Sequence, residues 1–364
     1  MDADTLEDLE RRARHGDAAA AKDFLVILRR LAASGSIDAK RVLGQVLLTR
    51  PPYGIVEGAA AIFDAARGGD AEAAHLAAIL AASGIGTQQN WPVALDFLQL
   101  SAERGWALAQ ATLVALTSDA DLASRASEGV QVSGLWKRLC DAVVMGEWLM
   151  PAAPVSVFDA PRIKKIPGFL SPPMCEWLIK RSAPLMSRAE TIDKAGGVQR
   201  VEEIRTGSAM NFNIVRSDVL LVILRARMAA ATGLTMSGME ASAVLHYAIG
   251  QQYLPHYDFL DPAFPGYRAD VATRGPRVAT FLIALNDSYE GGETDFPELG
   301  WRFKGRTGDA LLFWNVDAKG AIDPKTLHAG LPPASGEKFL FSQWVRDRPG
   351  ALFGPVMPAA SGAA

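Results

Sequence analysis

Three side chains that commonly bind metals lie in the C-terminal half of the chain. His256 and Asp258 are two residues apart in the stretch YLPHYDFLDP, and His328 follows 70 residues after Asp258. Residues two apart on an extended segment point to the same side, so this pair can offer two ligands from one strand. A His-x-Asp pair alone is also an ordinary loop feature, and His328, expected at the end of a strand, supplies the third ligand. Two imidazoles and one carboxylate suit non-haem Fe(II), because the remaining coordination positions stay open.

A lysine near His328 extends this interpretation. Lys338 lies ten residues beyond His328, at the start of the apolar stretch KFLFSQWVR. In an iron oxygenase that uses 2-oxoglutarate, the distal C5 carboxylate of that ligand needs a buried cation. A lysine in a Gly-Glu-Lys turn is otherwise a surface residue. With the three metal ligands present, the sequence predicts that Lys338 binds 2-oxoglutarate.

The bulk composition bounds the number of domains and the class of partner. A chain of 364 residues exceeds what one hydrophobic core usually supports, and 49% apolar residues suffice for two cores. The 37 basic and 40 acidic residues give a net charge of -3 with no block of like charge. We therefore expect two domains and no nucleic-acid partner.

Cysteine use and the N-terminal residues bear on the compartment. Cys140 and Cys175 are too few for a disulfide framework or a thiolate metal site. The N-terminal residues MDADTLEDLERRARHGD are acidic where a signal peptide would be basic and then apolar. No uncharged apolar run approaches the length of a membrane-spanning helix. These features predict a cytoplasmic protein with no membrane association.

The first domain, expected over residues 1–150, is predicted to be all helical. Apolar positions recur at helical spacing, and Gly69 and Gly105 occupy equivalent places 36 residues apart, with a weaker copy starting at Gly35. This period is typical of an α-solenoid of helix pairs. The segment LAAILAASGIGTQQNWPVALDFLQLSAERG resembles Sel1-like repeats, which are relatives of the tetratricopeptide repeat. The resemblance implies binding of a peptide or protein; the alternative is packing against the second domain or formation of a homodimer.

The second domain is expected over residues 151–350 and a flexible tail over 351–364, which makes the chain an α+β multidomain protein. A stretch with several prolines over 150–173, expected to be the linker plus a first strand, precedes two helices, which we expect Ser171 and Ser217 to cap. Beyond residue 240 the rhythm changes to short apolar runs, which predict antiparallel strands in a β-sandwich or barrel with helices on one side. The runs are ASAVLHYAIG, RVATFLIALN, DALLFWN and KFLFSQWVR.

Five ordered segments of this half resemble the prolyl 4-hydroxylases of the Fe(II)/2-oxoglutarate dioxygenase superfamily. They are EEIRTGSAMNF, YAIGQQYLPHYDF, RVATFLIALNDSYEGGETDFPELG, GDALLFWN and LHAGLPPASGEKFLFSQWVR. The resemblance implies a double-stranded β-helix, or jelly roll, with flanking helices. It also implies the following site residues: iron on His256, Asp258 and His328; 2-oxoglutarate on Lys338, with Tyr247 and Thr280 lining its pocket; Arg205 in a mobile loop over the substrate; and Trp344 near the active centre.

Two positions differ from the usual family pattern, namely Ala284 in the IALN segment and Phe339 after the lysine. Both changes leave the iron ligands intact and bear on the shape of the substrate pocket. The polar stretch over residues 187–207 is the expected lid, since the site must be shielded from water.

The function implied by the resemblance is hydroxylation of a C–H bond. The cofactors are Fe(II), 2-oxoglutarate and O2, with ascorbate as reductant, and the co-products are succinate and CO2. We expect a prolyl residue of a peptide or protein as the substrate, with the helical repeats helping to recruit it. Hydroxylation of a free amino acid or small metabolite is the alternative. A repeat scaffold without activity is a weaker alternative, because the two histidines, the aspartate and the lysine are all present.

Overall fold

The computed structural model describes residues 3–50, 54–192, 195, 197 and 199–348. Contacts between residues divide the chain into two compact units, one formed by Met1–Met145 with Ile214–Ile223 and the other by Gly146–Asn213 with Leu224–Ala364. The domain limits expected at residues 150 and 350 stay predictions. The tail expected over residues 351–364 lies outside the described residues.

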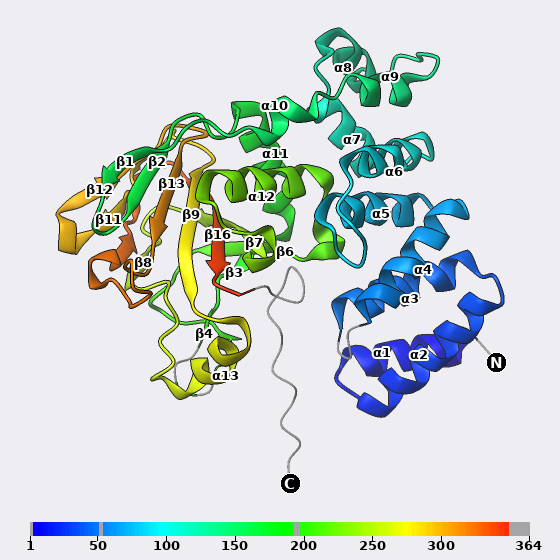
Figure 1. Cartoon of the computed structure of the whole chain (residues 1–364), viewed down its shortest axis with the longest axis horizontal. Helices are drawn as coiled ribbons and strands as arrows, with labels where there is room; N and C mark the ends of the chain where they lie inside the picture. The colour runs from blue at the N-terminus through cyan, green and yellow to red at the C-terminus, as the bar shows by residue number, and fades with distance from the viewer. Residues whose placement is uncertain (1–2, 51–53, 193–194, 196, 198, 349–364) are drawn as a thin grey trace. The chain divides into compact units, whose positions relative to one another are not determined.

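Short helices form the first unit, and each of the first seven packs against the next one along the chain (Figure 1). The two that follow, α8 and α9, pack on α7 and on each other. The helices of this unit are α1 (Ala3–Arg14), α2 (Ala18–Ala33), α3 (Ile37–Thr49), α4 (Ile55–Arg67), α5 (Ala71–Ser83), α6 (Trp91–Glu103), α7 (Ala107–Leu116), α8 (Ala120–Ser127) and α9 (Leu135–Asp141).

The same kind of turn opens several of these helices. Gly35, Gly69 and Gly105 all have positive φ angles, of 99°, 116° and 85°, a conformation that glycine adopts without steric cost. Ser36 and Asp70 follow the first two glycines, and their side chains accept hydrogen bonds from the first turns of α3 and α5. The equivalent positions noted in the sequence therefore share one local geometry.

Helix α5 is apolar on all sides and forms the core of the first unit. The ten residues Ala73–Ala82 are all buried, because α5 lies between α4 and α6. Alanine makes up much of this stretch, which lets the neighbouring helices approach closely. His75 is the polar exception, and it is 2% exposed.

Antiparallel sheets form the second unit. The largest has eight strands in the order β1-β2-β13-β9-β16-β7-β6-β3, and a smaller one has the order β12-β11-β14-β8. Two strand pairs, β10-β15 and β4-β5, complete the set in the described residues. The strands are β1 (Val155–Phe158), β2 (Ile163–Ile166), β3 (Ser187–Arg188), β4 (Thr191–Ile192), β5 (Gln199–Arg200), β6 (Ser208–Phe212), β7 (Ser242–Tyr247), β8 (Tyr253–His256), β9 (Arg277–Ala284), β10 (Glu290–Gly291), β11 (Thr294–Phe296), β12 (Trp301–Phe303), β13 (Ala310–Trp314), β14 (His328–Gly330), β15 (Pro333–Ser335) and β16 (Lys338–Arg346).

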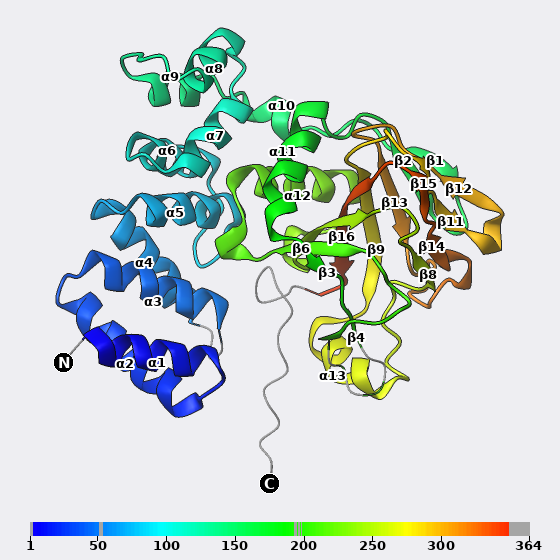
Figure 2. The same ribbon diagram turned by 180° about the vertical axis from the view of Figure 1, so that it is seen from behind.

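Helices and aromatic side chains hold the sheets in place. Phe296 of the small sheet contacts Phe313 of the large sheet, with ring centroids 5.3 Å apart, so the two sheets face each other. Figures 1 and 2 show that α11 lies on the side of the large sheet opposite to the small sheet. The remaining helices are α10 (Met145–Leu149), α11 (Pro172–Ser182), α12 (Val219–Thr232) and α13 (Pro265–Arg274), with single 3-10 turns at Ala183–Leu185, Ile214–Arg216, Met236–Gly238, Pro297–Leu299 and Pro324–Thr326.

The four strands predicted from apolar runs are present as β7, β9, β13 and β16. The helix cap expected at Ser217 is wrong by one residue: α12 starts at Val219, and Asp218 accepts the hydrogen bond from the Leu221 backbone N–H at 2.7 Å. Ser171 does precede α11 as predicted, but its side chain makes no capping bond to the described residues, and the prolines that follow it have no N–H to donate. Over the described residues, the helices are too short or too polar to span a bilayer.

Candidate active site

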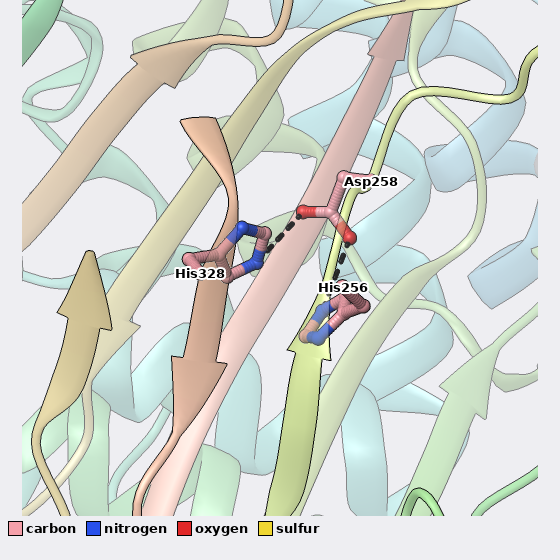
Figure 3. Close-up of side chains that lie close together, drawn as sticks. All are labelled: His256, Asp258 and His328. Carbon is pink, nitrogen blue, oxygen red and sulfur yellow. Dashed lines mark ion pairs between the residues drawn. The ribbon is translucent and has the colours of Figure 1, made fainter. Parts of the chain in front are cut away.

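The three predicted metal ligands meet between two strands of the small sheet. His256 ends β8, His328 begins β14, and the two are direct partners in the antiparallel register of these strands. His328 thus starts a strand, where the sequence suggested the end of one. Asp258 follows β8 by two residues, and Figure 3 shows its carboxylate between the two imidazoles.

The distances within this group fit a metal site. Asp258 Oδ1 lies 3.7 Å from His256 Nε2, and Asp258 Oδ2 lies 3.6 Å from His328 Nε2. One donor atom from each of the three residues lies within 4.8 Å of the others. In the described part of the chain, no other cluster of His, Cys, Asp and Glu reaches this spacing with three members.

Backbone carbonyls orient both imidazoles. His256 Nδ1 lies 2.8 Å from the Leu254 carbonyl oxygen, and His328 Nδ1 lies 3.0 Å from the Thr326 carbonyl oxygen. A carbonyl accepts only, so each Nδ1 carries the proton and donates. In this tautomer the lone pair of each Nε2 atom is available to a metal. A hydrogen bond from the other ring nitrogen to a carbonyl is the usual outer contact of metal-binding histidines.

Aromatic rings pack on both histidines and fix their planes. Tyr253 stacks on His256, with centroids 3.4 Å apart and an interplanar angle of 17°. Phe313 meets His328 edge-on at 4.9 Å, and Phe296 stacks on the same ring at 5.6 Å. The imidazoles are therefore held by packing as well as by hydrogen bonds, before any ion binds.

Protonation in this group also suits a metal. Burial and the neighbouring His328 lower the pKa of His256 to about 3, so its ring is neutral near pH 7. Burial alone would raise the pKa of Asp258, but the two imidazoles and Arg277 hold it below its usual range. Metal binding requires a neutral imidazole and an ionised carboxylate, and both forms prevail here.

A cavity opens beside the three candidate ligands. Successive even-numbered residues of β16 line it, because alternate residues of a strand face the same side. The residues around the cavity are Arg205, Leu245, Tyr247, Tyr253, His256, Asp258, Leu282, Thr294, His328, Gly330, Lys338, Leu340, Ser342 and Trp344.

Lys338 presents a buried cation to this cavity. Lys338 is 2% exposed, and its Nζ has no hydrogen-bond partner among the described residues. The nearest ring is that of Tyr247, whose centroid lies 5.5 Å from Nζ. Burial lowers the pKa of Lys338 to about 7. An unpaired buried ammonium group is costly, so this wall of the cavity is suited to an anionic ligand.

The two threonines near the site have different surroundings. Thr280, expected in the wall of a 2-oxoglutarate pocket, is absent from the cavity-lining residues. Its hydroxyl donates to Asp258 Oδ2 at 2.8 Å instead. Thr294, which sequence reasoning missed, lines the cavity with Lys338. Thr294 lies in the segment GGETDF, two residues after a pair of glycines with positive φ.

Arg205, which was expected in a loop over the substrate, and Trp344, which was expected near the active centre, both border the cavity. Arg205 is 6% exposed, and its guanidinium lies over the Tyr253 ring at 4.9 Å. Its backbone also pairs with Tyr253 in an isolated β-bridge. Within the described chain, Trp344 Nε1 is buried and lacks a hydrogen-bond partner. Both side chains thus present N–H donors near the metal ligands.

Arg277 is a further residue of this region that sequence reasoning missed. Its guanidinium lies over the Trp344 ring at 3.7 Å. Glu240 accepts two hydrogen bonds from it, at 2.7 and 2.9 Å, and also pairs with Arg346. Burial opposes ionisation of Glu240, but the arginines outweigh it and lower its pKa to about 2. Arg277 and Glu240 lie 37 residues apart in the sequence, so no local pattern reveals the pair.

The two positions at which the chain departs from the family pattern lie away from the cavity. Phe339 points to the opposite face of β16 from Lys338, where its ring packs against His246 in a tilted arrangement with centroids 4.6 Å apart. Ala284 is 1% exposed and is not among the cavity-lining residues. Neither side chain therefore contacts the cavity directly, although both positions were expected to bear on its shape.

Comparison with known proteins identifies the family. The model of the 2OG-Fe(II) oxygenase superfamily matches residues 242–346. The Arabidopsis thaliana protein named probable prolyl 4-hydroxylase 3 is 33% identical over 204 residues, which cover 51% of this chain and 69% of that protein. The chain belongs to the prolyl 4-hydroxylase family of 2OG-Fe(II) oxygenases. This family implies Fe(II), 2-oxoglutarate and O2, so the chain is a 2-oxoglutarate-dependent dioxygenase, as predicted.

Two solved structures resemble parts of this prolyl 4-hydroxylase family member. A viral collagen prolyl hydroxylase from Paramecium bursaria Chlorella virus-1, in complex with 2-oxoglutarate, is 29% identical, with a TM-score of 0.39 over 50% of this chain and 94% of that protein. A Sel1 repeat protein from Oxalobacter formigenes is 27% identical, with a TM-score of 0.25 over 28% of this chain and 42% of that protein.

Proposed function

We propose that this dioxygenase hydroxylates a prolyl residue in a peptide or protein, with Fe(II) held by His256, Asp258 and His328. The observation that carries the proposal is the meeting of these three side chains beside a buried lysine, in a chain of the prolyl 4-hydroxylase family. Two imidazoles and one carboxylate fit Fe(II) and leave positions open for other ligands.

We propose Lys338 as the residue that binds the C5 carboxylate of 2-oxoglutarate. The buried Nζ supports this role, because a carboxylate would accept the hydrogen bonds that no described protein group accepts from it. Tyr247 and Thr294 border the same part of the cavity. When bound, Fe(II) with 2-oxoglutarate and O2 supplies the oxidising power for C–H hydroxylation, and succinate and CO2 are released. The apolar lining of Leu245, Leu282 and Leu340 excludes water from the reacting groups.

Arg205 and Trp344 are the proposed substrate-binding residues. Each has a buried N–H group without a partner among the described residues, namely Arg205 Nε and Trp344 Nε1. Backbone carbonyls of a peptide are suitable acceptors for such donors. We propose that the stretch over residues 187–207 closes over the substrate. In support, the C-terminal end of this stretch is joined to β8, where the Leu254 backbone N–H donates a hydrogen bond of 2.8 Å to the Ile204 carbonyl.

The finer features of the architecture are also proposals. We propose that the two facing antiparallel sheets form a double-stranded β-helix and that the consecutive helices α1–α7 form a Sel1-like solenoid. The repeated glycine turns at residues 35, 69 and 105 support the solenoid. We further propose that these repeats recruit the polypeptide substrate; formation of a homodimer is the alternative role. Ascorbate as reductant and a cytoplasmic location complete the proposal.

The test is succinate release from 2-oxoglutarate by the full-length protein with Fe(II) and ascorbate, with and without proline-containing peptides. Mass spectrometry of the peptide reports the gain of one oxygen atom on proline. Asp258→Ala should abolish both signals. Asp261→Ala is the matched control, since this nearby aspartate accepts a hydrogen bond from Ala263 N and lies outside the cavity lining.

Each outcome of this assay distinguishes the alternatives. Turnover that rises with peptide and places the oxygen on proline supports the proposed substrate. Turnover that is indifferent to peptide and rises with a free amino acid or small metabolite favours that substrate class. A protein that retains no iron and releases no succinate contradicts the proposed site residues.

A further inference from the structure

A buried chain of hydrogen bonds ends on the Asp258 carboxylate. Thr280 Oγ1 donates to Asp258 Oδ2 at 2.8 Å, and Asn315 Nδ2 donates to Thr280 Oγ1 at 3.1 Å. The exposed fractions of Asp258, Thr280 and Asn315 are 6%, 0% and 1%, so solvent does not compete for these bonds. Thr280 belongs to β9, and Asn315 directly follows β13. The large sheet thus reaches the metal ligands through two side chains.

The direction of these bonds follows from the chemistry of the groups. Asn315 Nδ2 also lies 3.3 Å from the Arg277 carbonyl oxygen, which only accepts hydrogen bonds. The amide nitrogen of Asn315 must therefore face both Arg277 and Thr280. A hydroxyl has one proton, and since Thr280 Oγ1 accepts from Asn315, its own proton is directed to Asp258. The order of donation is Asn315 to Thr280 to Asp258, and we refer to these three residues as the carboxylate relay.

The oxygen atom of the Asn315 amide indicates that this residue is present for its N–H group. Asn315 Oδ1 is buried and lacks a hydrogen-bond donor among the described residues. A buried amide oxygen without a donor is destabilising, because it loses its hydrogen bonds to water on folding. An apolar residue at this position would avoid that cost. What the amide contributes in return is the N–H that sets the direction of the Thr280 hydroxyl.

We propose that Thr280 and Asn315 are positioning residues that fix the rotation of the Asp258 carboxylate for metal binding. This inference rests on the proposed function, because it requires Asp258 to be a metal ligand. The terminal torsion of an aspartate is broad and roughly two-fold, so packing alone leaves the carboxylate plane poorly defined. A donor held by a second donor removes that freedom before the ion arrives. Outer contacts of this kind typically change metal affinity by about 10- to 100-fold.

The test is a titration of metal-free full-length protein with Co(II), followed by isothermal calorimetry. Thr280→Val keeps the shape of the side chain and removes the hydroxyl, and it should weaken Co(II) binding by about 10- to 100-fold. Thr280→Ser keeps the hydroxyl and should restore affinity close to that of the unaltered protein. Asn315→Asp keeps the shape but turns the donor into an acceptor that draws the Thr280 proton away from Asp258. It should therefore weaken binding as Thr280→Val does.

Urea unfolding of the metal-free variants separates positioning from a structural defect. Thr112→Val is the matched control, since Thr112 is also 0% exposed and its hydroxyl donates to a backbone carbonyl in the first unit. If Thr280→Val does not fold, Asn315→Asp and Thr280→Ser carry the test. Equal Co(II) affinity in the unaltered protein and in folded relay variants would overturn the inference. Absence of Co(II) binding to the unaltered protein would instead overturn the proposed function, and this inference with it.

Discussion

Lys338→Met removes a buried ammonium group from the cavity wall and keeps a long, unbranched side chain in its place. Burial lowers the pKa of Lys338 from 10.5 to about 7, and the charge of Glu293 only partly offsets this effect. The fall in pKa corresponds to at most about 5 kcal/mol of lost stability in the ligand-free protein. We expect the variant to be more stable by about 1 to 4 kcal/mol, the range seen when buried charges are replaced by apolar side chains.

This gain depends on pH in a defined direction. The lysine has a pKa near 10.5 in the unfolded chain and about 7 in the folded one. Below about pH 7 both states are protonated, and the full cost of burying the charge is present. As the pH rises from about 7 to 10.5, the folded lysine is already neutral and the cost fades. The stability difference between Lys338→Met and the unaltered protein should be larger at pH 6 than at pH 9.

Urea unfolding of the metal-free full-length protein, followed by near-ultraviolet circular dichroism at both pH values, measures this difference. Lys180→Met is the control, because Lys180 is 74% exposed and pairs with Glu176 on the surface of α11. Calorimetry on Mn(II)-loaded protein should show 2-oxoglutarate affinity reduced about 100-fold or more in Lys338→Met, since a carboxylate then lacks its buried partner. A variant that is less stable at pH 6, or that binds 2-oxoglutarate with unchanged affinity, would refute the reasoning.

Three further predictions follow from the site. Above pH 7, binding of 2-oxoglutarate should be accompanied by proton uptake at Lys338, because this lysine has a pKa of about 7 and must be charged to pair with the carboxylate. Equal calorimetric heats of binding in two buffers of different ionisation enthalpy at pH 8 would contradict this. Tyr253→Ala should weaken Co(II) binding through loss of the ring stacked on His256, whereas Tyr253→Phe should not, and equal titrations for both variants would count against a role for stacking. Glu240→Gln should lower the free energy of unfolding by about 3 to 5 kcal/mol, because Arg277 and Arg346 lose their buried counter-charge; a urea midpoint that does not move would show that the pairs are dispensable.

The parts of this fold that the sequence predicts are those with local signals. The long strands β9 and β16 alternate or run apolar over eight and nine residues, enough for the pattern to be visible. Strands of the small sheet, such as β11 and β14, have three residues each and no periodicity to detect. The grouping of His256, Asp258 and His328 was nevertheless predictable, because the type and spacing of three polar residues carry chemical meaning without knowledge of the sheet.

The surroundings of the site depend on contacts that no short segment contains. Thr280 and Thr294 both lie on strands, and only the pairing of the sheets determines that Thr280 meets Asp258 while Thr294 borders the cavity. The stacking of Arg277 on Trp344 depends on the register of β9 against β16, which is set over more than 60 residues of chain. Such register is a property of the folded sheets, so sequence reasoning reached the ligands and stopped short of their neighbours.

The direct pairing of His256 with His328 has a consequence for how such a site can diverge. Their separation is fixed by one rung of an antiparallel ladder and does not depend on the length of chain that joins them. Helix α13 and the turns between these strands can therefore be lengthened, shortened or exchanged while the ligand geometry persists. A shift of one residue between β8 and β14 would turn one imidazole to the opposite face and abolish the site. Changes in the length of the loops that join the strands between β8 and β14 should therefore be tolerated far better than a single deletion within β8 or β14.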